Sequence, residues 1–308
     1  MKSCRAILIA GPTASGKSAL AIEVAERYGG VVINADSMQV YRELRILTAR
    51  PSPEEEAQVP HRLFGFVPAR EAYSVGRYVT DAATAVAEVQ AEGKLPVLVG
   101  GTGLYFKALL EGLSPIPPVS PDVRQHWRDE AGRLGAEALH RILAERDAEM
   151  ATRLSPGDTQ RIVRALEVLD STGQSLTVWQ TIRGQGVLSE DETVRLVLLP
   201  EREALYHRIE ARFDRMISDG VLDEVRALQA LDLDPALPVM TAHGVPTLMS
   251  ALAGTMAMED AISVAKADTR HYAKRQFTWL KRNMIAWSSF NLQQMQSSLR
   301  LLDLSINI

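Results

Sequence analysis

Apolar residues in the first hundred positions follow two alternating patterns. Residues 5–10, 31–33 and 95–99 are short runs of aliphatic and β-branched residues, which is typical of strands buried in a parallel sheet. Residues 18–28 and 74–92, which lie between these runs, carry apolar positions at helical spacing. Strands that alternate with helices predict an α/β fold with a parallel, doubly wound sheet flanked by helices.

The middle of the chain follows a helical pattern. Four prolines between residues 114 and 121 indicate a domain boundary, and helical spacing then continues to Thr172. A buried-strand pattern returns at 194–199, and helices are predicted from there to the end of the chain, the clearest over 264–284. We therefore predict an α/β core formed by residues 1–119 and 191–308, with an all-helical insertion domain at 120–190.

Composition excludes several classes of protein. The 308 residues are 46% hydrophobic and 23% charged, as in an ordinary globular protein. No apolar run approaches the roughly 18 residues that span a bilayer, and the N-terminal run is too short for a signal peptide, so we expect a cytoplasmic protein that has no membrane contact. The single cysteine, Cys4, excludes an internal disulfide and is expected in the core. A net charge of −4 restricts any nucleic-acid site to a local patch.

Residues 11–18 form a phosphate-binding motif. Their sequence, GPTASGKS, fits G-x-x-x-x-G-K-[ST] and lies between a predicted strand and a predicted helix. Backbone N–H groups, the helix N-terminus and a lysine would bind a di- or triphosphate, and Ser18 can hold Mg²⁺. A glycine-rich turn with a surface lysine is the alternative, which this context disfavours. The predicted diphosphate-binding residues are Gly11, Pro12, Thr13, Ala14, Ser15, Gly16, Lys17 and Ser18.

Two further segments follow predicted strands and should lie at the same sheet edge as this motif. Asp36 follows the second strand, and its carboxylate suits either a water-mediated Mg²⁺ contact or a general base, with a turn or capping residue as the alternative. The glycine-rich segment 100–105 follows the third strand. It is either a tight strand-to-helix turn or a place where a ligand approaches the backbone closely.

Basic residues gather in two predicted helices. Between residues 266 and 282, six Lys or Arg and one Asp give a local excess of +5 away from the apolar face, and Trp279 lies among them. A solvated charged face is the alternative. In the insertion, Asp158 is predicted to cap a helix on which Arg161 and Arg164 lie together, beside an inward face of Ile162, Leu166 and Leu169. Arg212, by position alone, suits a surface ion pair.

Five segments in order resemble the tRNA dimethylallyltransferase family, also called tRNA isopentenyltransferases, over nearly the whole chain. The resemblance implies a P-loop NTPase-like fold that transfers a dimethylallyl group from dimethylallyl diphosphate to N6 of the adenosine directly 3′ of the anticodon. The anticodon stem-loop of tRNA is then the partner and Mg²⁺ the cofactor, and we expect a monomer. The segments are GPTASGKS (11–18), ADSMQVYRELRILTARPS (35–52), LVGGTGLYFKALLEGL (98–113), DTQRIVRALEVLDSTG (158–173) and TRHYAKRQFTWLKR (269–282).

The resemblance also implies roles for single residues. Thr13 and Lys17 would contact the diphosphate, Ser18 would hold Mg²⁺, Asp36 would be the general base on the adenine amine, and Arg212 would reach the diphosphate from the C-terminal half. The implied tRNA-binding residues are Asp36, Ser37, Met38, Gln39, Thr102, Arg124, Gln160, Arg161, Ile162, Val163, Arg164, Lys274, Arg275, Gln276 and Lys281.

The chain departs from the family pattern in three places. Ser18 stands where Thr is common, which keeps the hydroxyl. Residues 240–245 replace a segment that usually contains Gly-Tyr-Arg, so His243 is either a substitute contact or a turn residue. Residues 60–65 lack the Asp that many members carry, and no role is assigned there.

Three alternative functions use the same residues differently. A small-molecule kinase would use the phosphate-binding motif on ATP, and a related adenylate dimethylallyltransferase would act on a free nucleotide. Neither has a need for the basic helix or for Arg161 and Arg164. A noncatalytic RNA-binding protein would not need Thr13, Lys17 and Asp36 intact.

Overall fold

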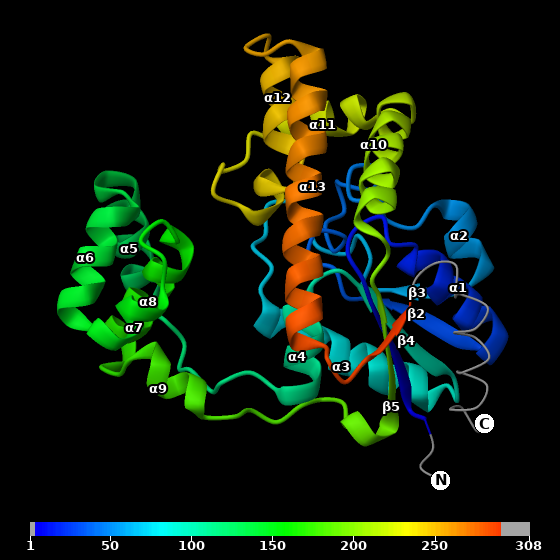
Figure 1. Cartoon of the computed structure of the whole chain (residues 1–308), viewed down its shortest axis with the longest axis horizontal. Coiled ribbons are helices and arrows are strands. Elements are labelled where there is room, and N and C mark those ends of the chain that lie inside the picture. Colours follow the sequence, from blue (N-terminus) through cyan, green and yellow to red (C-terminus); the bar gives the residue numbers. More distant parts are fainter. Residues whose placement is uncertain (1–3, 291–308) are drawn as a thin grey trace. The chain divides into compact units, whose positions relative to one another are not determined.

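The computed structural model describes residues 4–290 and contains a six-stranded, fully parallel sheet (Figure 1). The strand order is β3-β2-β4-β1-β5-β6. Every pairing between neighbours is parallel, with Ile9 opposite Val99 on one side and Leu196 on the other. The strands are β1 (Ala6–Ala10), β2 (Gly30–Asn34), β3 (His61–Arg62), β4 (Leu95–Gly100), β5 (Thr193–Leu198) and β6 (Ser288–Phe290).

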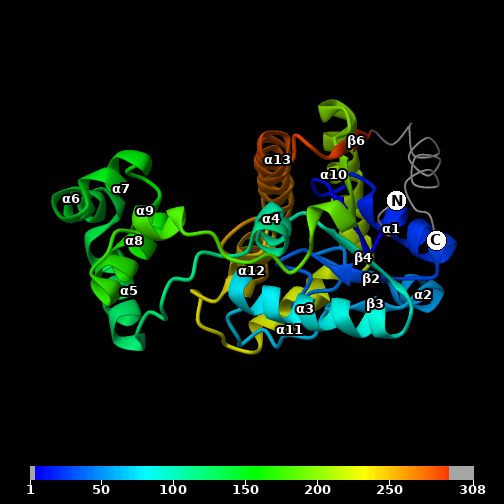
Figure 2. The same ribbon diagram turned by 90° about the horizontal axis from the view of Figure 1, so that it is seen from below.

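The central strands are apolar on both faces because helices cover both faces. Ile7 and Ile9 of β1 pack with α1, whereas Ala6 and Leu8 face the helices on the opposite side. The two helices α1 and α3 accordingly lie on opposite sides of the strands (Figure 2). The helices of this α/β unit are α1 (Lys17–Tyr28), α2 (Pro53–Gln58), α3 (Val75–Ala91), α4 (Gly103–Glu111), α10 (Arg202–Ser218), α11 (Val221–Gln229), α12 (Val245–Leu252) and α13 (Met258–Asn283).

Residues 111–186 form a second compact unit, and residues 4–110 and 187–290 belong to the first. The second unit is helical and has its own apolar core, which includes Leu139, Leu143 and Leu166. Asp158 caps α8 through the Arg161 N–H, as predicted. The helices are α5 (Pro121–Leu134), α6 (Ala136–Arg146), α7 (Ala148–Arg153), α8 (Thr159–Thr172) and α9 (Leu176–Thr181).

The chain leaves the first unit and returns to it at nearly the same place. The carbonyl of Leu109 accepts hydrogen bonds from the N–H groups of Val187 and Leu188, at 2.7 and 3.0 Å. Just beyond, a Cβ on Gly112 would lie 2.5 Å from the carbonyl carbon of Gly184, so only glycine allows the outgoing and returning segments to run so close together.

The predicted fold class is confirmed, including the parallel sheet and the helical insertion. Sequence patterns missed the short elements α2, β3 and β6, which are too short to show a period. Two positions predicted to face the core are only partly buried: Cys4, which precedes β1, and Leu169. The helices expected after residue 290 fall outside the described residues. Within residues 4–290, no helix is both long enough and apolar enough to cross a membrane.

Candidate active site

The motif at residues 11–18 forms a phosphate-binding loop, or P-loop, between β1 and α1. Gly16, at φ 88°, turns the chain into α1, and Ala14, at φ 60°, is one of few non-glycine residues in the left-handed region. The Ser15 N–H donates to the Pro12 carbonyl at 3.2 Å. A helix N-terminus preceded by such a loop presents backbone N–H groups to an anion.

Lys17 is buried at the base of this loop, although lysine is a residue that proteins keep exposed. Its side chain is 8% exposed and its ammonium donates to the Pro12 carbonyl at 3.3 Å. Burial, with a smaller contribution from the Arg212 guanidinium, lowers the pKa of Lys17 to about 8 against the opposing effect of the Asp36 carboxylate. A buried ammonium is held here at a cost, which an anionic ligand would offset.

Helix α10 contributes two arginines that bond to consecutive residues of the P-loop. Arg212 donates from Nη2 to the Thr13 hydroxyl at 2.5 Å, and Arg208 donates from Nε to the Ala14 carbonyl at 3.0 Å. Burial lowers the pKa of Arg212 to about 10, and the Asp36 carboxylate acts against that shift. The buried Lys17 and the partly buried Arg212 therefore face one carboxylate, which leaves an excess of positive charge for a phosphate ligand.

Asp36 lies two residues after the end of β2, and its backbone is fixed by the last residue of that strand. The fully buried Asn34 accepts from the Asp36 N–H at 2.8 Å and donates to the Asp36 carbonyl at 3.0 Å. Oδ1 of Asp36 accepts from the Met38 N–H at 3.0 Å. Ser37 donates through its N–H to the Thr102 hydroxyl at 3.0 Å, which joins this segment to the turn after β4.

The glycine-rich turn after β4 is shaped by close contacts with the protein itself. A Cβ on Gly100 would lie 1.9 Å from the Ala35 carbonyl oxygen, and one on Gly103 would lie 2.0 Å from the Trp279 ring. Gln276 fills the space beside Gly101: its amide donates to the Gly101 carbonyl at 2.9 Å. The other end of that amide accepts from the Thr13 N–H at 2.8 Å, so Gln276 joins this turn to the P-loop.

One cavity brings these groups together at the carboxyl edge of the sheet. The P-loop and α10 contribute Thr13 and Arg212, and Asp36 lies in its wall. The remaining lining side chains are mostly apolar. Two of them, His243 and Tyr272, carry rings and lie near Asp36. Its lining residues are Thr13, Asp36, Met38, Leu47, Thr48, Ile209, Arg212, Phe213, Met216, Ala242, His243, Thr269 and Tyr272.

The departure at residues 240–245 places a histidine in this cavity. The ring of His243 lies 4.6 Å from that of Tyr272, at an interplanar angle of 42°. Burial lowers the pKa of His243, as does Arg275, against the opposing effects of Asp268 and Asp36. His243 therefore presents a neutral ring at neutral pH. His243 lies in the turn that precedes α12 and also lines the cavity, so its role as a substitute contact stays a prediction.

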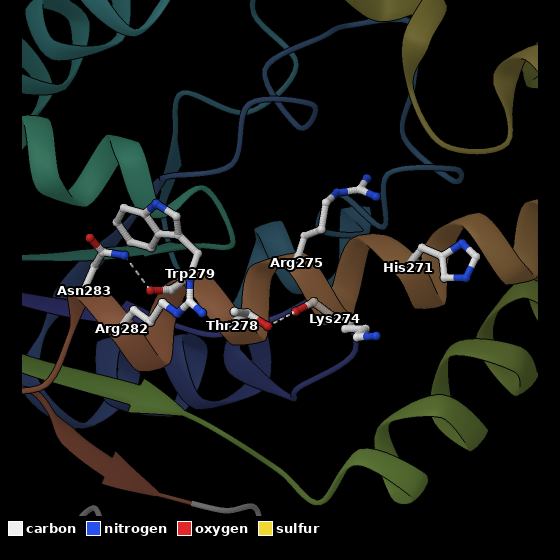
Figure 3. Close-up of a pocket in the computed structure, with 7 residues that line it drawn as sticks. All are labelled: His271, Lys274, Arg275, Thr278, Trp279, Arg282 and Asn283. Carbon is white, nitrogen blue, oxygen red and sulfur yellow. Dashed lines mark hydrogen bonds between the residues drawn. The ribbon is translucent and has the colours of Figure 1, made fainter. Parts of the chain in front are cut away.

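The exposed side of α13 carries the basic residues predicted from the sequence. Arg275 and Trp279 project from the same side of the helix, beside a hollow of about 510 Å³ that Lys274 and Arg282 also line (Figure 3). Lys274, Arg275 and Lys281 are exposed. Lys266 and Arg270 instead pair with the α10 carboxylates of Asp214 and Glu210, at 2.6 and 2.5 Å. The basic surface is therefore smaller than the sequence indicated.

The structure buries two of the residues expected to contact tRNA. Gln276 is 6% exposed and holds the P-loop, and Ile162 is fully buried in the core of the helical unit. Neither side chain offers a surface to a large partner. In the helical unit, Arg124, Gln160 and Arg161 are exposed, whereas Arg164 is partly buried and pairs with Glu167 at 3.3 Å, and Val163 packs partly buried against the core.

No group of three or more His, Cys, Asp or Glu side chains suited to a metal ion occurs among the described residues. The hydroxyl of Ser18, partly exposed in the first turn of α1, is the P-loop group that fits Mg²⁺. A cation there would need the oxygens of a bound phosphate and water to complete its coordination.

Sequence reasoning missed three residues that fix the site. Asn34 and Arg208 hold Asp36 and the P-loop through backbone groups, and Glu224 of α11 accepts three consecutive N–H groups from residues 45–47. Helical spacing could have predicted that Gln276 is buried, because it lies three residues after Ala273 and four before Leu280 on the buried face.

Comparison with known proteins identifies the family. The family model described as IPP transferase matches residues 39–283, and that described as isopentenyl transferase matches residues 4–66. A protein of Nitrobacter hamburgensis named tRNA dimethylallyltransferase is 56% identical over 286 residues, which cover 92% of this chain and 90% of that protein.

Solved structures are similar to this chain in both fold and sequence. The full-length tRNA isopentenylpyrophosphate transferase of Bacillus halodurans is 32% identical, with a TM-score of 0.70 over 98% of this chain and 96% of that one. A eukaryotic dimethylallyltransferase described as acting on tRNA is 28% identical, with a TM-score of 0.81 over 97% of this chain and 78% of that one. These matches run through the P-loop, Asp36 and the basic helix, and the chain belongs to the IPP transferase family.

Proposed function

We propose that this chain transfers a dimethylallyl group from dimethylallyl diphosphate to N6 of the adenosine directly 3′ of the anticodon in tRNA, releasing diphosphate. One observation carries the proposal: the cavity joins phosphate-binding groups to a carboxylate and an apolar wall. Thr13, Arg212 and Asp36 all line this cavity. A prenyl diphosphate needs the phosphate-binding groups and the apolar wall, and the acceptor adenine needs the carboxylate.

The cationic part of the site binds the diphosphate. Lys17, Arg212, Thr13 and the N–H groups of the P-loop provide positive charge and donors for the oxygens that gain charge as the allylic C–O bond breaks. Ser18 would hold Mg²⁺ beside those oxygens. When bound, this ion adds charge stabilisation to the leaving diphosphate.

Asp36 is the general base. As the allylic carbon forms its bond to N6, the exocyclic amine must lose a proton, and a positioned carboxylate accelerates such a step by about 10²- to 10⁴-fold. Asn34 and the Met38 N–H hold Asp36 in place, so the carboxylate is preorganised before the adenine of the tRNA arrives. The neutral rings of His243 and Tyr272 provide a surface beside it for the adenine.

Exposed side chains on both units bind the anticodon stem-loop. An adenine stacked in a loop must be turned out to reach the cavity, and the contacts around it hold the RNA. On α13, Lys274, Arg275 and Lys281 are exposed and would contact the phosphate backbone. On the helical unit, Arg124, Gln160 and Arg161 offer further contacts, and the turn with Ser37 and Thr102 lies next to Asp36.

A transfer assay tests this function directly. The purified protein is incubated with Mg²⁺ and radiolabelled dimethylallyl diphosphate, together with unmodified tRNA or with AMP. Label in tRNA alone is expected. Label in AMP would instead indicate a nucleotide prenyltransferase, and label in neither would contradict the proposal. A tRNA with guanosine in place of the target adenosine is the matched control, because it keeps the RNA surface and removes the acceptor amine.

A further inference from the structure

The cavity at the P-loop is lined by charged, polar and apolar side chains. Its charged lining residues are Arg212 and Asp36, and Arg212 donates to the Thr13 hydroxyl. Three further lining residues of α10 share the helix face of Arg212, because they are spaced by three or four residues. Met216 follows Arg212 by four residues, about 6 Å along the helix. The apolar wall consists of Met38, Leu47, Ile209, Phe213, Met216 and Ala242.

The far side of this wall is closed by close packing. Leu47 is 9% exposed and Phe213 is 3% exposed. Both pack against Gly244, at φ 97°, where an added Cβ would be 2.9 Å from Cδ1 of Leu47 and 3.6 Å from Cε2 of Phe213. No larger residue fits at position 244 without movement, so Leu47 and Phe213 are closely packed on this side.

Leu47 is held in position by hydrogen bonds at two points of its loop. The Glu224 carboxylate accepts from the N–H groups of Arg45, Ile46 and Leu47 at 2.7, 2.7 and 2.9 Å. The Gln39 amide donates to the Thr48 and Ala49 carbonyls at 2.9 and 2.8 Å. A carboxylate that binds three consecutive N–H groups fixes the backbone, so Leu47 cannot swing away to admit a longer ligand at little cost.

We propose that Leu47, positioned by Glu224 and backed by Phe213 and Gly244, closes the prenyl end of the cavity and limits the transferred chain to five carbons. The inference rests on the proposed function. The cavity volume is about 70 Å³. Residues that face the diphosphate and the adenine line the same small space, so little of it is left for a prenyl chain longer than dimethylallyl.

Competition between two donors tests the proposal. Dimethylallyl and geranyl diphosphate differ in tail length and share the same reacting end, where the C–O bond breaks, the C–N6 bond forms and the amine proton leaves. The measured quantity is the ratio of their kcat/KM values with the same tRNA. Leu47→Ala should narrow the preference for dimethylallyl diphosphate by about tenfold or more, and Leu47→Val by less. Leu228→Ala, a fully buried leucine of α11 outside the cavity, is the matched control.

The ratio is independent of how much protein is folded, because both donors report on the same active molecules. A narrowed ratio in both Leu47 variants and an unchanged ratio in Leu228→Ala would support the proposal. An unchanged ratio in Leu47→Val and Leu47→Ala with dimethylallyl transfer retained would overturn it. So would a change confined to the KM for tRNA, which would assign this wall to the nucleoside. Wild-type protein that transfers neither chain would refute the proposed function itself.

Discussion

Replacing Lys17 by methionine should stabilise the ligand-free protein while removing its affinity for diphosphate. The ammonium of Lys17 is buried, and burial lowers its pKa from 10.5 to about 8. Each pKa unit corresponds to about 1.4 kcal/mol, so at pH 7 the folded state bears a penalty of about 3 kcal/mol for keeping this group charged. Methionine has similar length and no charge, so Lys17→Met should raise the free energy of unfolding by up to that amount.

The stability gain should depend on pH in a defined direction. Between pH 8 and pH 10.5 the unfolded state binds more protons at Lys17 than the folded state, so the penalty is complete below pH 8 and is relieved as the pH rises toward 10.5. At pH 9.5 it should have fallen to about 1.4 kcal/mol. Urea unfolding at pH 7 and pH 9.5 measures the difference between variant and wild type at each pH.

A second measurement on the same samples separates stability from binding. Inorganic diphosphate with Mg²⁺ should raise the melting temperature of the wild type and not that of Lys17→Met, because ligand binding to the folded state alone stabilises it. Lys94→Met, at an exposed lysine paired with Glu92, is the control and should change stability by no more than about 0.5 kcal/mol. A Lys17→Met protein that is less stable than wild type at pH 7 would refute the reasoning about the buried charge.

Three further changes address the other parts of the site. Asp36→Asn should slow the single-turnover chemical step by about 10²-fold or more and leave the Kd for tRNA unchanged in filter binding; normal chemistry with weakened binding would contradict the general-base assignment. Replacing both Lys274 and Arg275 by alanine should reduce the slope of log Kd for tRNA against log salt by about 1.4 to 1.8, and an unchanged slope would mean that this helix face is merely solvated. Gln276→Leu should raise the KM for dimethylallyl diphosphate more than the KM for tRNA, because the Thr13 N–H and the Gly101 carbonyl lose their partner; equal rises in steady-state kinetics would count against a role at the P-loop.

The sequence predicted the P-loop well because everything that defines it is local. The motif, the strand before it and the helix after it lie within about 25 consecutive residues, and each has its own pattern. Asp36 was predicted for a related reason: the carboxyl ends of parallel strands share one edge, so a residue that follows β2 must lie near the P-loop.

Arg212 shows which contacts local sequence patterns cannot predict. Its contact with Thr13 joins residues 199 positions apart, and it depends on how α10 packs against the sheet edge. No local pattern distinguishes it from a surface arginine, and only the resemblance to a family singled it out. The cavity wall around Leu47 has the same origin, since Glu224 reaches that loop from a helix about 180 residues away.

Gln276 was expected to contact tRNA, and the structure buries it instead. Lys274 and Arg275, its charged neighbours, made the whole segment resemble an RNA-binding surface, although helical spacing turns Gln276 toward the buried face. A buried amide is stable only with hydrogen-bond partners, and here both of its ends have one. A polar residue at a core position of an amphipathic helix is therefore a useful sign of a positioning contact.

The point where the chain leaves and re-enters the α/β unit has a consequence for how this architecture can vary. Leu109 accepts from both Val187 and Leu188, so residues 110–186 form, in topological terms, one long loop closed by a short stem. Loop-closure entropy grows only with the logarithm of length, and doubling such a loop costs only about 0.6 kcal/mol. The stability of the α/β unit therefore depends little on the length of the insertion. The helical unit can lengthen, shorten or be exchanged while the strands at the catalytic edge keep their register.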